Sequence, residues 1–147
     1  MKHFGSNFEH TEERNEDIIR AYMEEIGRCD QIYLPQVFDN IVNAPSKRFW
    51  VSAERAAIVI SSMMRGDTLE AMRPTKREMF REIYRRVKIL QEQHPKMSIS
   101  EMVLQVVQEP APKFYLTAGS AKVIIYRVRK QWFKKRSQEL RRLRLQR

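Results

Sequence analysis

Apolar residues recur at helical spacing through most of this chain, and two nine-residue segments have the most regular pattern. In each segment the apolar positions fall at i, i+3, i+4, i+7 and i+8, which form one face of a helix. The first segment contains Leu34, Val37, Phe38, Ile41 and Val42, and the second contains Ile99, Met102, Val103, Val106 and Val107. Pro45 and Pro110 follow the two segments and predict where both helices end.

A longer apolar stripe precedes each segment. It predicts one helix over roughly Glu12–Arg28 and another over roughly Lys76–Gln93. Thr75 and Glu78 have the spacing of a capping box, which predicts that the second of these helices starts just after Pro74.

A further helix is predicted after each segment. An N-cap hydroxyl, Ser52 in the first case and Thr117 in the second, can accept a bond from the first turn. Gly66 predicts the end of the earlier helix, because glycine tolerates the left-handed conformation found there. The later helix meets no such glycine and can continue through Arg136 towards Leu145. The predicted fold class is therefore all-α.

The six predicted helices form two similar halves. Residues 11–65 and 76–130 align without a gap at an offset of 65, and nine of the 55 aligned positions are identical, six of them within residues 41–60. This pattern predicts a tandem duplication of a three-helix unit. We expect a flexible lead over 1–10, units over 11–65 and 76–130 joined by a linker over 66–75, and a basic helix or tail over 131–147.

The helix order and the tandem duplication resemble Myb-type and homeodomain-like trihelical units, in which a helix-turn-helix element contacts DNA. The turn over residues 43–51 is longer than in those families. The third helix of the first unit also has only one cation, Arg55, among residues 53–60. The second unit is better supplied with cations, so the resemblance implies nucleic-acid contacts there.

Charge is distributed unevenly between the two ends of the chain. The net charge is +10, but residues 1–40 contain 4 Lys/Arg and 9 Asp/Glu, whereas residues 41–147 contain 24 and 9. An excess of this size attracts polyanions, of which nucleic acid is the commonest. The predicted nucleic-acid contacts are Lys122, Arg127, Arg129, Lys130, Lys134, Lys135 and Arg136, with Lys113, Tyr115, Lys47 and Arg48 as secondary ones.

The secondary contacts belong to a repeated loop motif. Arg48 precedes Phe49-Trp50, and Lys113 precedes Phe114-Tyr115, so each copy combines a phosphate-seeking cation with a ring able to stack on a base. The alternative is structural, with the aromatic side chains bracing the turn. For the two phenylalanines we favour burial in the core, because large aromatic surfaces are usually buried.

The favoured function is non-enzymatic binding of nucleic acid, with double-stranded DNA ranked above RNA. One alternative is an interaction or self-assembly module, in which the basic tail meets an acidic protein or a second copy; contact with an anionic membrane surface ranks below both. His3, His10, His94 and Cys29 are scattered without a paired base, so no catalytic residues are predicted. We also expect no metal, no cofactor, no membrane span and a cytoplasmic location.

Overall fold

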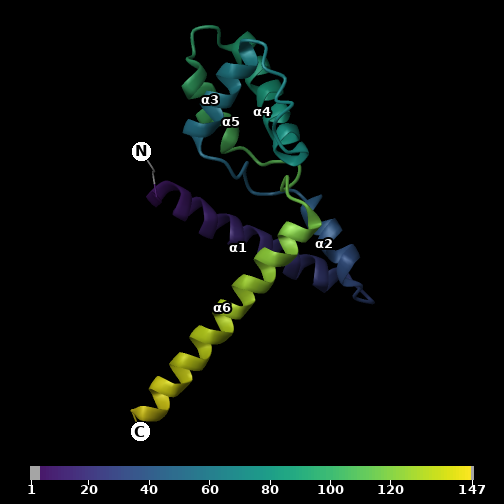
Figure 1. Cartoon of the computed structure of the whole chain (residues 1–147), viewed down its shortest axis with the longest axis vertical. Coiled ribbons are helices and arrows are strands. Elements are labelled where there is room, and N and C mark those ends of the chain that lie inside the picture. The colour runs from purple at the N-terminus through teal and green to yellow at the C-terminus, as the bar shows by residue number, and fades with distance from the viewer. Residues whose placement is uncertain (1–3, 147) are drawn as a thin grey trace.

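The computed structural model describes residues 4–146, with side chains from residue 10 onwards, and this part of the chain forms helices but no strands (Figure 1). The all-α prediction is confirmed. The six helices are α1 (Phe4–Arg28), α2 (Leu34–Val42), α3 (Ala53–Met64), α4 (Pro74–Gln93), α5 (Ile99–Val107) and α6 (Ala118–Leu145).

Most helix boundaries follow from local signals. The hydroxyls of Ser52, Ser98 and Thr117 each accept a bond from the backbone N–H three residues later, which confirms the caps predicted for α3 and α6 and the cap that the spacing of Ser98 and Glu101 predicts for α5. Gly66 has a φ of 105° just beyond the end of α3, as its position predicted. α6 continues to Leu145, because nothing in its sequence interrupts it.

Two helix starts differ from prediction. α4 begins at Pro74, with Arg73 as N-cap and no side-chain cap, so the predicted capping box of Thr75 and Glu78 is wrong. Proline at the first helical position needs no N–H partner and already has a helical φ. The helix therefore starts at Pro74, two residues before the predicted start at Lys76. α1 begins at Phe4 instead of near Glu12, and so runs through most of the segment predicted as a flexible lead.

The helices pack into two three-helix bodies, only one of which consists of three consecutive helices. α1 and α2 pack against α6, whereas α4 and α5 pack against α3 (Figure 1). α2 and α3 do not contact each other, so the structure does not form the consecutive helix-turn-helix arrangement that the sequence suggested. The extended segment between them, residues 43–52, carries the chain from one body to the other instead of folding back.

Two crossing segments, residues 43–52 and 108–117, join the bodies. Ser46 and Ala111 exchange backbone hydrogen bonds of 3.0 and 3.1 Å in an antiparallel bridge. The N–H of Phe49 donates to Val107, and the N–H of Phe114 donates to Val42, at 3.0 and 3.1 Å. Both sets of bonds are reciprocal at an offset of 65 residues, because Ser46 corresponds to Ala111, Phe49 to Phe114 and Val42 to Val107, so the crossing has local two-fold character.

The crossing places one phenylalanine in each hydrophobic core. Phe49 is fully buried in the core of α3, α4 and α5, and Phe114 is 5% exposed in the core of α1, α2 and α6. The prediction that both rings fill cores is confirmed. Each ring therefore anchors one crossing segment to the body that the segment enters.

A buried carboxylate fixes the first crossing segment to α1. Asp17 is 1% exposed, and its oxygens accept bonds from Arg20 at 2.6 and 2.9 Å, from the N–H of Lys47 at 2.8 Å and from Nε1 of Trp50 at 3.1 Å. In the other body Glu82 occupies the equivalent position, 65 residues later, and binds Arg85 and Arg86. Asp17 therefore holds the first crossing segment against α1 through its bonds with Lys47 and Trp50.

Tyr115 lies in the second crossing segment with its ring stacked on Phe49, at a centroid distance of 6.0 Å. Burial, and then the negative charges of Glu82 and Glu78, raise the pKa of its hydroxyl to about 12. The fold therefore favours the protonated phenol. The contribution of the protonated Tyr115 hydroxyl to the free energy of unfolding is fully present below the unfolded pKa of about 10. This contribution is lost as the pH rises towards 12.

Replacing Tyr115 with phenylalanine tests this pH dependence, because the ring is kept and the ionisation removed. Between pH 9 and pH 11 we expect the wild-type protein to lose about 1 kcal/mol more unfolding free energy than Tyr115→Phe, since only the wild type must deprotonate a buried phenol. Urea unfolding of both proteins at each pH measures the difference. Equal losses would contradict the prediction.

Candidate interface on the projecting helix

α6 leaves the body of the protein after its third turn. Ala121, Ile125 and Val128 are buried against α1 and α2, but every residue from Arg129 to Gln146 is exposed. At 1.5 Å per residue this part of the helix projects by roughly 27 Å. It forms the arm at the C-terminal end of the molecule (Figure 1).

Positive charge strongly predominates on α6. α6 contains ten Lys/Arg and a single acid, Glu139. Four of the cations follow one another at steps of three, four and seven residues, a spacing that places them along one side of the helix. We call this set the basic stripe: Arg127, Lys130, Lys134 and Arg141, all exposed.

A second arginine adds charge at the foot of the basic stripe. Arg14 of α1 and Arg127 line one hollow of about 410 Å³ together with Gly119 and Ser120, which belong to the first turn of α6. Burial, and then the charge of Arg127, lower the pKa of Arg14. Its Nε has no hydrogen-bond partner among the described residues. Positive charge is therefore concentrated where α6 begins. An anion bound there would offset the repulsion between the guanidinium groups of Arg14 and Arg127.

The remaining predicted contacts on α6 point elsewhere. Lys122 lies over the ring of Tyr126 at 5.8 Å, and the guanidinium of Arg129 lies 6.0 Å from the ring of Tyr22. Lys135 lines a groove beside α1, which Lys134 of the basic stripe borders as well. Arg136 is exposed on the side of the helix away from the basic stripe.

The predicted contacts in the crossing segments have partners within the protein. Arg48 donates to the carbonyls of Phe49 and Val51, and burial lowers its pKa. Lys113 forms an ion pair with Glu78. Tyr115 is 7% exposed, so its ring is in the core and not on the surface where a base could stack, whereas the side chain of Lys47 is exposed.

Two cations of this surface, Arg141 and Arg14, are not among the contacts predicted from the sequence. Arg141 could have been found, because it continues the helical spacing of Arg127, Lys130 and Lys134. Arg14 could not, because it lies in an acidic part of the sequence and meets Arg127 only after α1 packs against α6.

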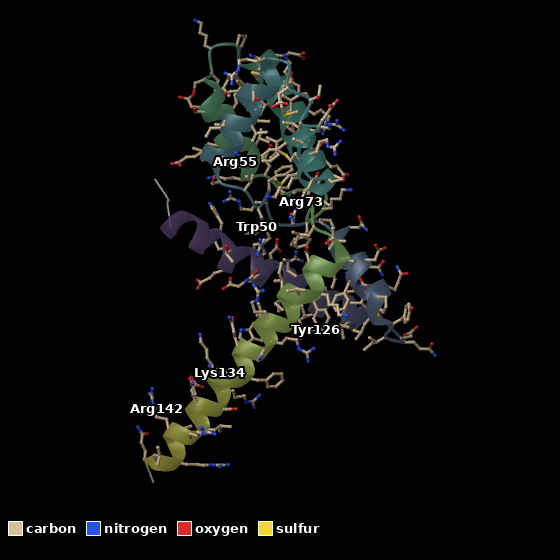
Figure 2. The ribbon with its side chains drawn as sticks, in the orientation of Figure 1. Trp50, Arg55, Arg73, Tyr126, Lys134 and Arg142 are labelled. Carbon is tan, nitrogen blue, oxygen red and sulfur yellow. The ribbon has the colours of Figure 1, made fainter. Side chains whose placement is uncertain are left out.

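The projecting part of α6 also exposes an apolar surface. Trp132 is 53% exposed and Phe133 63%. Leu140 and Leu143 follow further out at 51% and 61%. These side chains lie on a different side of the helix from the basic stripe (Figure 2, where Tyr126, Lys134 and Arg142 mark the course of α6).

Comparisons with known proteins give no family for this chain. No family model, no curated protein and no solved structure matches it. Within the described residues, no helix is long and apolar enough to cross a membrane, and no group of His, Cys, Asp and Glu has a metal-binding arrangement.

Proposed function

We propose that the protein binds nucleic acid through the basic stripe of α6, and that the preferred target is double-stranded DNA. The observation that carries the proposal is the exposed arm, on which Lys130, Lys134 and Arg141 continue along one side of α6 the line of cations that begins at Arg127. Lysine and arginine at this spacing can neutralise successive phosphates and release their counterions. Arg14 at the foot of the stripe would add one further contact.

The dimensions of the arm favour DNA over RNA. A helix with its side chains is about 10–12 Å across, which matches the major groove of B-form DNA. The major groove of A-form RNA is too narrow and deep to admit side chains in the same way. RNA is the alternative ligand for the same surface.

We also infer that the chain arose by internal duplication. The gapless alignment at an offset of 65 supports this inference, as do the reciprocal bonds of Ser46 with Ala111 and of Phe49 and Phe114 with α5 and α2. In such a history the second copy kept the shared helices and extended the third one into the arm. Most of the basic stripe would then be a feature of the second copy, since Ser62 corresponds to Arg127 and α3 ends before the positions that correspond to Lys134 and Arg141, whereas Lys130 corresponds to a cation, Arg65.

Truncation after Gln131 tests the proposed function. The shortened chain keeps Ala121, Ile125 and Val128, the buried residues of α6, and loses most of the exposed arm. We expect fluorescence anisotropy to show tight, salt-sensitive binding of a DNA duplex by the full chain and at least tenfold weaker binding by the shortened one. RNA duplex and single-stranded DNA serve as competitors. Equal binding by both chains would place the site on the two helical bodies instead.

A further inference from the structure

We infer that a second copy of this chain docks on the arm, with the outer part of α6 from one copy seated in the groove between α1 and α6 of the other. Binding of phosphates by the basic stripe leaves the apolar side of the arm in water. Phe133, Leu140 and Leu143 are each more than half exposed. A single exposed helix is also marginally stable in water, and packing of an apolar face supplies most of the stability of such helices in proteins.

The proposed receiving site is a groove of about 570 Å³ at the base of the arm. Val128 and Trp132 supply its apolar surface. On one side Glu12 and Glu16 of α1 form an acidic wall, and on the other Lys134 and Lys135 of α6 form a basic wall. The groove thus has an apolar floor between opposite charges, which fits a helix with an apolar stripe and a charge of opposite sign on each flank.

The outer part of α6 has this pattern. Leu140 and Leu143 are one turn apart on the same side of the helix. At 100° per residue, Glu139 borders the two leucines on one flank, and Arg144 borders them on the other. Glu139 can therefore face the basic wall of a groove while Arg144 faces the acidic wall.

The occupant must come from another molecule. The outer part of α6 cannot fold back into its own groove, because the same uninterrupted helix forms one wall of that groove. Charge also favours a second copy: α1 contains seven acids and three Arg, and α6 ten Lys/Arg and one acid. Simple pairing of two α6 helices along their lengths would instead bring like charges together, which is unfavourable.

Reversing the charge of the acidic wall in one variant, and of the arm in another, tests the inference. The experiment uses no nucleic acid, so its result does not depend on the proposed function. The wall variant is Glu12→Lys with Glu16→Lys, and the arm variant is Arg144→Glu. Light scattering after size-exclusion chromatography in low salt should show the wild type as a dimer. We expect each variant alone to associate at least about tenfold more weakly, because like charges then meet in the groove.

A mixture of the two variants is the decisive sample. The basic wall of one then meets the acidic arm of the other, and the two unchanged surfaces also match, so the mixture should regain the wild-type mass. Glu70→Lys with Glu92→Lys, two exposed acids of the other body, is the control for the change in net charge and should remain dimeric. A monomeric wild type, variants that dimerise normally or a mixture that stays monomeric would each overturn the inference.

Discussion

Replacing the four cations of the basic stripe with alanine is expected to weaken binding of duplex DNA on the order of 100-fold near physiological salt. Each surface contact with a phosphate contributes up to about 1 kcal/mol, and four contacts are removed together. The slope of log affinity against log salt should fall by about 3 to 4, because each lost phosphate contact retains about 0.9 counterions. Anisotropy titrations at three or more salt concentrations measure both quantities.

The matched control removes the same charge from the other body. Arg55, Arg73, Arg81 and Lys88 are exposed cations of the body formed by α3, α4 and α5 (Arg55 and Arg73 are labelled in Figure 2). Changing these four to alanine lowers the net charge equally but leaves α6 intact. We expect a much smaller loss of affinity and a nearly unchanged salt slope. If the two sets of substitutions had the same effect, binding would depend on net charge and not on the stripe.

Replacing Asp17 with alanine is expected to lower the free energy of unfolding by about 2 to 4 kcal/mol. The carboxylate accepts four bonds, from Arg20, Lys47 and Trp50, and its removal leaves these donors without their partner in a buried site. This cost is at the lower end of what removing one partner of a buried ion pair usually costs, because the side chain of Arg20 is 33% exposed and can be hydrated. Urea denaturation monitored by circular dichroism measures the change.

Two further substitutions show which bonds of Asp17 matter. Asp17→Asn keeps the shape but loses the charge and one acceptor, so its cost should be intermediate. Glu24→Gln weakens only the exposed ion pair with Arg20 and should cost less than about 1 kcal/mol. A cost of similar size for Asp17→Ala and Glu24→Gln would contradict a structural role for the buried carboxylate.

The sequence predicted the parts of the interface that depend on one helix. Ten cations against one acid identify α6 as basic, and helical spacing alone separates the basic stripe from the leucines. It did not predict which cations are already engaged. Arg48 donates to backbone carbonyls of its own segment, and Lys113 pairs with Glu78, which the fold brings to it from α4.

Sequence by itself determined the number of helices, nearly all their ends and the two phenylalanines of the cores, because periodicity, caps and proline act within one turn of the chain. Only the tertiary structure decided which helices pack together. α3 and α6 have similar apolar faces, so the local pattern allows either helix in either body. The structure packs α3 with α4 and α5, packs α6 with α1 and α2, and pairs the two crossing segments at Ser46 and Ala111. That long-range choice also directs the outer half of α6 away from both bodies and brings Arg14 beside Arg127.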